Sequence, residues 1–133
     1  MTIDLYISSQ PEERRELLKA LHCIITDNDK TVTATVGPMM GKEMILYHAP
    51  GIFKYGLASV KNYMSLHVLP VYGSPTLCDK YKKLLPRAAF QKGCINFKDA
   101  AEMPPDTVTA LIHDCAKIDL KQIRDAWLQS KKK

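Results

Sequence analysis

The sequence predicts an α+β fold: one antiparallel sheet of about five strands, with helices packed on one of its faces. Apolar residues recur at helical spacing near the start, in the middle and near the end of the chain, and alternating segments lie between them. The links between consecutive predicted strands are short, which favours antiparallel pairing. A chain of 133 residues can form one hydrophobic core without disulfides or metal, but not two full domains. We therefore expect residues 1–133 to form a single domain.

The first long helix is expected after Ser9-Gln10-Pro11-Glu12, where Ser9 would cap the first turn and proline is tolerated. Its apolar residues recur at helical spacing as far as Ile25, and Arg14 falls on the solvent side. The helix should end near Thr26.

Three further helices have start signals of the same kind. Ser74-Pro75 begins one that stops before Pro86, and Pro104-Pro105 opens the next. Asp119 and Gln122 resemble a capping box for a last helix.

Strict alternation of apolar and polar residues predicts a strand over 31–36, and residues 93–98 alternate again. Lys61-Asn62 is a plausible two-residue turn, because Asn tolerates positive φ. In that register Gly56 faces His67 and Ala58 faces Ser65, and the glycine would leave room beside the imidazole. The predicted strands cover residues 31–36, 43–48, 56–60, 63–69 and 93–98.

Helices on one side only would leave the other sheet face to water, a ligand or a partner. We expect a non-enzymatic binding domain that uses this outer face, with Tyr63, Ser65 and His67 as central contacts and Asn96 beside them. Tyr and His are amphipathic enough for such a role. A plain solvated face is the alternative. The partner would be a protein or a small molecule, and a homodimer stays open.

Sequence motifs for catalysis, metals and cofactors are lacking. The chain has no Gly-x-Ser-x-Gly, no phosphate-binding or dinucleotide-binding glycine loop and no His-Glu-x-x-His, and its four cysteines form no Cys-x-x-Cys pair. We therefore assign no catalytic residue, metal ligand or cofactor. An enzyme would require His48 or His67 beside Cys94 or a carboxylate.

The net charge is +5, and three of the positive charges are the terminal Lys131, Lys132 and Lys133. A nucleic-acid site would use the basic helix 75–87, through Lys80, Lys83 and Arg87, but the modest charge argues against it. The N-terminal residues do not resemble a secretory signal, and no apolar run reaches membrane-spanning length. A cytoplasmic location without a membrane partner is expected.

Several segments resemble the YdhG-like family of small bacterial domains. The resemblance rests on Lys54-Tyr55-Gly56, the hairpin from Val60 to His67, Gly93-Cys94-Ile95-Asn96-Phe97 and the Pro104-Pro105 helix. It covers about residues 5–118 and leaves 119–133 as a C-terminal helical extension. It implies a sheet-and-helix domain in agreement with the pattern above.

One member of that family is described as a frataxin-like iron chaperone, and frataxins bind iron on an acidic ridge of their first helix. Frataxin-like iron handling is therefore an alternative, through Glu12, Glu13 and Glu16. Here Arg14 and Arg15 interleave with these acids, so no iron ligands are carried over. A partner on the sheet face is implied by analogy only.

Overall fold

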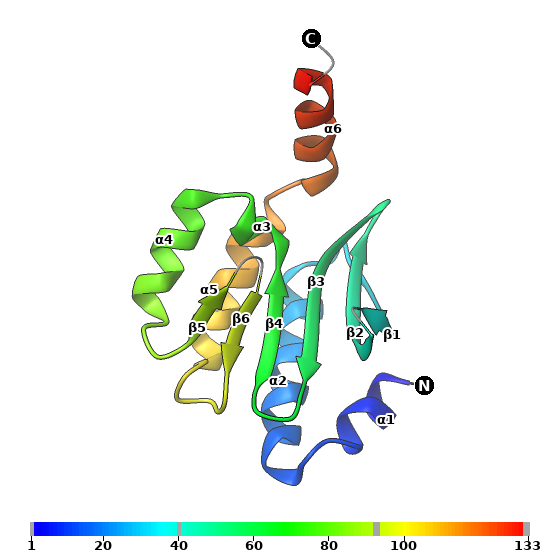
Figure 1. The fold of residues 1–133 in the computed structure, drawn as a ribbon, viewed down its shortest axis with the longest axis vertical. Helices are drawn as coiled ribbons and strands as arrows, with labels where there is room; N and C mark the ends of the chain where they lie inside the picture. Colours follow the sequence, from blue (N-terminus) through cyan, green and yellow to red (C-terminus); the bar gives the residue numbers. More distant parts are fainter. Residues whose placement is uncertain (1, 40, 92–93, 132–133) are drawn as a thin grey trace.

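The computed structural model describes residues 2–39, 41–91 and 94–131. It contains one antiparallel sheet with the strand order β1-β2-β3-β4-β6-β5 (Figure 1). The predicted α+β class is confirmed, with six strands in place of about five. The strands are β1 (Thr33–Met39), β2 (Lys42–Ala49), β3 (Ile52–Ser59), β4 (Met64–Val68), β5 (Ala89–Gln91) and β6 (Cys94–Phe97). The helices are α1 (Ile3–Ser8), α2 (Glu12–Asn28), α3 (Leu69–Tyr72), α4 (Pro75–Leu84), α5 (Pro105–Ala116) and α6 (Leu120–Lys131).

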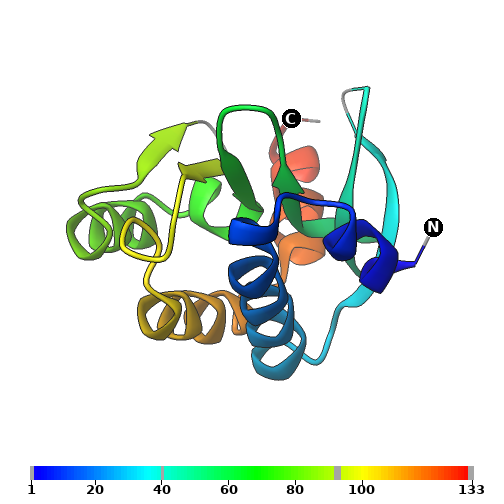
Figure 2. The same cartoon turned by 90° about the horizontal axis from the view of Figure 1, so that it is seen from below.

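The long helices α2 and α5 lie side by side against one face of the sheet, behind the strands in Figure 1 and below them in Figure 2. No helix of the described residues covers the opposite face, because α4 lies beside the sheet and α6 runs beyond its end. The core between the layers is built from fully buried side chains of α2, α5 and the central strands, including Leu18, Leu21, Ile25, Leu57, Leu66, Ile95, Leu111 and Ile112.

The start of α2 differs from the prediction. Ser9 ends the short helix α1, and its hydroxyl donates to the Tyr6 carbonyl at 2.7 Å. Pro11 occupies the N-cap of α2, where no side chain caps the helix. The reason is that α1 forms an extra helix of its own, which buries Tyr6 and Ile7 against the core.

The starts predicted for the three further helices, at Ser74-Pro75, Pro104-Pro105 and Asp119, are confirmed, and two of them have a side-chain cap. The Ser74 hydroxyl accepts a hydrogen bond from the Leu77 N–H at 3.3 Å, and the Asp119 carboxylate accepts one from the Gln122 N–H at 3.1 Å. In both cases a polar side chain satisfies a backbone donor that the helix itself leaves free.

The central hairpin also has the predicted register. Val60 donates its N–H to the Tyr63 carbonyl at 2.9 Å, which closes the turn around Lys61-Asn62. The facing pairs are Gly56 with His67 and Ala58 with Ser65.

Arg14 does not belong to the solvent side of α2 as predicted. Its guanidinium donates to the Ser59 hydroxyl at 2.9 Å and to the backbone carbonyls of Val60, Lys61 and Tyr63. A guanidinium has five donors in a planar fork, so one side chain can satisfy several acceptors of one turn. Arg14 therefore attaches the hairpin turn to α2.

β5 is a strand that the sequence did not predict, since three residues are too few to show an alternation. It pairs with β6 and places Ala89 beside Asn96 and Gln91 beside Cys94. β6 therefore lies inside the sheet, between β4 and β5. Gly93, predicted as the first residue of this strand, lies outside the described residues.

Candidate functional site

The uncovered face of the sheet, here called the outer face, carries two rows of cross-strand neighbours. Ser65 of β4 and Asn96 of β6 are direct neighbours in one row, and His67 and Cys94 are direct neighbours in the next. Three of the four predicted contacts are thus brought together. The first row crosses β3, β4, β6 and β5 and consists of Ala58, Ser65, Asn96 and Ala89. The second row crosses all six strands and consists of Thr35, Leu46, Gly56, His67, Cys94 and Gln91.

The centre of the outer face is well shielded from water although no helix lies on it. Ala58 and Ser65 are each only 5% exposed, and Asn96 is partly buried. The side-chain oxygen of Asn96 is buried and accepts no hydrogen bond within the described residues. A buried acceptor without a donor costs about 1–3 kcal/mol, so such atoms are rare in folded proteins.

His67 is half-buried beside this pair. Burial lowers the pKa of His67 below its ordinary value, because the imidazolium would lose its hydration. The ring is therefore neutral near pH 7, and it carries one donor and one acceptor nitrogen.

Tyr63 lies just before β4, at the end of the hairpin turn, and is 37% exposed. Its carbonyl is held by the N–H of Val60 and by Arg14. It is therefore placed at the margin of the outer face and outside the cross-strand rows, rather than at their centre.

The space above Gly56 is not left for an imidazole, as the sequence had suggested. A Cβ at this position would overlap the terminal methyl of Met44 and lie 3.1 Å from Cζ of Phe53, with Cβ of His67 at 3.4 Å. Met44 is 2% exposed. The glycine therefore makes room for an apolar layer on the outer face, beside His67.

The residues required by the enzyme alternative are only partly assembled. Cys94 is the cross-strand neighbour of His67, but no hydrogen bond joins them among the contacts of the described residues. His48 is exposed and its ring contacts Phe53, with the ring centroids 5.7 Å apart.

A buried polar network on the helix side was missed by the sequence reasoning. Asp29 is fully buried and accepts from Lys54 at 2.7 Å, from the Tyr55 hydroxyl at 2.7 Å and from both the backbone N–H and the hydroxyl of Thr31. Burial alone would raise the pKa of Asp29, but these hydrogen bonds outweigh it and hold the pKa below its usual value. The available signal was a lysine inside the strand Ile52–Ser59.

A β-bulge explains why Lys54 reaches the core side. Tyr47 pairs with Tyr55 and His48 with Phe53, so β3 has one residue more than β2 at this point. Lys54 and Tyr55 are consecutive, yet both bind Asp29. The bulge thus breaks the alternation from which the sequence assigns residues to faces.

The acidic residues of α2 and the basic residues of α4 are the groups that the iron and nucleic-acid alternatives require. Glu12, Glu13 and Glu16 are exposed, and no cluster of three or more His, Cys, Asp or Glu that could hold a metal occurs in residues 2–39, 41–91 and 94–131. Lys80 of the basic helix binds Asp114 at 2.9 Å.

Comparison of the chain with protein-family models, curated proteins and solved structures finds no match, so the YdhG-like resemblance stays a prediction. None of the described helices has the length and apolar character needed to cross a membrane.

Proposed function

We propose that this protein is a non-enzymatic binding domain, and that the outer face of its sheet docks a protein partner. The observation that carries the proposal is the buried side-chain oxygen of Asn96 at the centre of that face, which has no hydrogen-bond donor among the residues that the structure describes. A donor from a partner would satisfy this acceptor, so binding would remove a cost that the free domain bears.

The composition of the outer face indicates what kind of group would dock. Ala58, Ser65 and Ala89 have small side chains, which allow another chain to approach the strands closely. Neutral His67 adds one donor and one acceptor, and Tyr63 at the margin adds aromatic area of the kind enriched at protein interfaces. Uncharged groups of this kind favour a polar, uncharged protein segment that presents an N–H or O–H donor.

A cytoplasmic location accompanies this proposal. All four cysteines are free, and Cys23 is exposed, which suits a reducing compartment. Frataxin-like iron handling and nucleic-acid binding have no observation of comparable weight behind them.

The experiment starts from a photo-crosslinking residue placed at Tyr63, with the same residue placed at Lys83 on α4 as the control. A partner of the outer face should crosslink in lysate from position 63 and not from position 83. Equal crosslinking from both positions would contradict the proposal, and so would the absence of any protein crosslink from position 63.

The captured partner is then purified and its Kd is measured for three variants. Asn96→Leu should weaken binding by about 1 kcal/mol or more, which is roughly fivefold, because it removes the acceptor at nearly constant side-chain size. Tyr63→Ala/His67→Ala should weaken binding further. His113→Ala, at an exposed histidine of α5, is the control and should leave Kd unchanged.

The stability of the free domain gives a second readout. Asn96→Leu should raise the free energy of unfolding by about 1 kcal/mol, because it removes a buried acceptor that lacks a donor. A variant that binds less and is less stable would mark Asn96 as a packing residue and would count against the proposal.

A further inference from the structure

Helix α4 is attached to the helix layer and stands off the edge of the sheet. The Asp114 carboxylate of α5 accepts from Lys80 at 2.9 Å and from the Tyr81 hydroxyl at 2.6 Å, both on α4. Tyr81 is fully buried. These contacts hold α4 beside α5, at the β5 end of the sheet (Figure 1).

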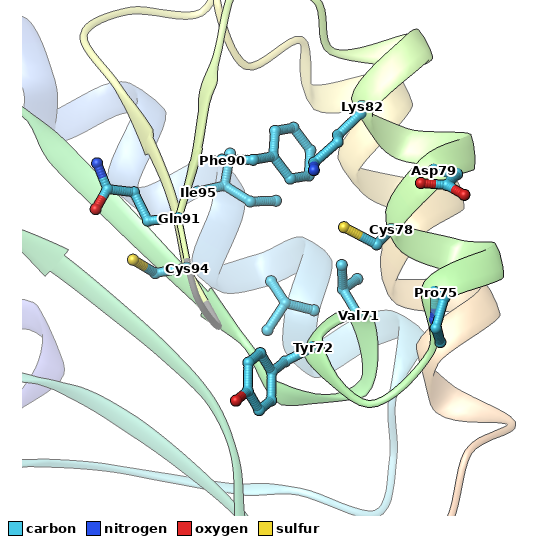
Figure 3. A pocket seen from close by; sticks show the side chains of 11 residues that line it. Val71, Tyr72, Pro75, Cys78, Asp79, Lys82, Phe90, Gln91, Cys94 and Ile95 are labelled. Atoms are coloured by element: carbon cyan, nitrogen blue, oxygen red, sulfur yellow. The ribbon is translucent and has the colours of Figure 1, made fainter.

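A cavity of about 470 Å³ lies between α3, α4 and the strands β4, β5 and β6 (Figure 3). Its walls are mostly apolar, which is typical of sites for small molecules. The apolar lining consists of Val68, Val71, Pro75, Phe90 and Ile95.

Part of this lining is left in contact with water. Phe90 is only partly buried, and Tyr72 at the lower edge of the cavity in Figure 3 is 64% exposed. Exposed aromatic area is unfavourable in water, and an apolar ligand would cover it.

The charged groups of the cavity come from one turn of α4, and Gln91 and Cys94 of the strands add further polar atoms. Cys78 and Lys82 are four residues apart and both line the cavity, and Figure 3 shows the Lys82 ammonium extended toward the Phe90 ring. Within the described part of the chain, Lys82 forms no ion pair. Asp79 also lines the cavity, so the two charges cancel. A neutral rim disfavours phosphates and dicarboxylates, whereas one free ammonium suits a single carboxylate.

We infer that this cavity binds a small apolar monocarboxylate, with its hydrocarbon body between Val71 and Phe90 and its carboxylate on Lys82. This second site is separate from the centre of the outer face. It does not depend on the docking proposed there.

The test uses phenylpropionate and its uncharged counterpart phenylpropanol as probes, and measures Kd by NMR titration of the full chain. Lys82→Gln should weaken phenylpropionate about two- to fivefold, the range of an exposed charge pair, and should leave phenylpropanol unchanged. Lys83→Gln, at the neighbouring exposed lysine that does not line the cavity, is the matched control and should change neither Kd.

Thiol protection locates the ligand without any substitution. Phenylpropionate should slow alkylation of Cys78 by iodoacetamide and leave that of exposed Cys23 unchanged, as read by mass spectrometry. Cys78→Trp should fill the cavity and abolish binding.

Three results would overturn the inference. They are a phenylpropionate Kd that Lys82→Gln does not change, alkylation of Cys78 that the acid does not slow, and no saturable binding of either probe.

Discussion

Removing the ammonium of Lys54 tests the buried network most directly. Lys54→Met keeps most of the side-chain length but leaves the Asp29 carboxylate, which is 0% exposed, with Thr31 and Tyr55 as its remaining donors in the described part of the chain. Breaking a buried ion pair by removing one partner typically costs about 3–5 kcal/mol. Since a domain of this size has about 5–15 kcal/mol in total, the loss should be large in urea denaturation followed by circular dichroism.

Asp29→Asn, which removes the other charge of the ion pair, should lower the free energy of unfolding less than Lys54→Met does. Lys54 lines a second cavity, next to Thr31 and Lys117, so its ammonium has a route to water if Asp29 is changed to Asn. The double variant Lys54→Met/Asp29→Asn should recover part of the loss of Lys54→Met, because no buried charge remains. A double variant as unstable as the sum of the two single variants would refute this account of the network.

The stability of the domain should depend on pH through the ionisation of Asp29. Asp29 has a pKa below its usual value, so its contribution to stability is fully present above the unfolded pKa of about 3.9 and is lost as pH falls through the lower folded value. In Lys54→Met, burial should instead raise the pKa of Asp29. The difference in stability between wild type and this variant should therefore begin to shrink as pH falls through that raised pKa and should shrink further as pH falls through the lower folded pKa of wild type, and a constant difference would contradict the reasoning.

Three further predictions concern the outer face and its supports. Arg14→Gln should cost about 1–3 kcal/mol, because it removes donors to several turn acceptors, and hydrogen exchange of residues 60–63 should speed up; Arg15→Gln is the control. Gly56→Ala should cost about 1–3 kcal/mol in urea denaturation through overlap with Met44, and an unchanged midpoint would count against that packing. The pKa of His67 is lowered, so the stability due to its neutral ring is present above about pH 6.5 and is lost as pH falls through the folded value. His67→Gln should flatten the loss of stability between pH 7 and pH 5, leaving the part due to His22, whose pKa is also lowered by burial, whereas His113→Gln should not.

Local signals were sufficient for much of the fold. In the caps of α4 and α6, a side chain accepts a hydrogen bond from a backbone N–H only three residues further along the chain. The hairpin register follows from a two-residue turn and from alternation along two adjacent strands. Such contacts join residues that are close together in the sequence, so residue types and their spacing are enough to identify them.

The outer-face site could be predicted in part. Tyr63, Ser65 and His67 follow one another at every second position, which assigns them to one face. Asn96 was expected beside these residues, but its direct pairing with Ser65 depends on the strand order β4-β6-β5, which brings together segments about 30 residues apart in the chain.

By itself, the sequence determined the α+β class, the hairpin register and most helix starts, because hydrophobic periodicity and helix capping involve residues only a few positions apart. Tertiary structure alone decided that Lys54 crosses to the helix side and binds Asp29, that Arg14 holds the hairpin turn, and that Asn96 finds no donor in residues 2–39, 41–91 and 94–131. Each of these depends on groups distant in the chain, whose burial and hydrogen bonding are set only when the layers pack together.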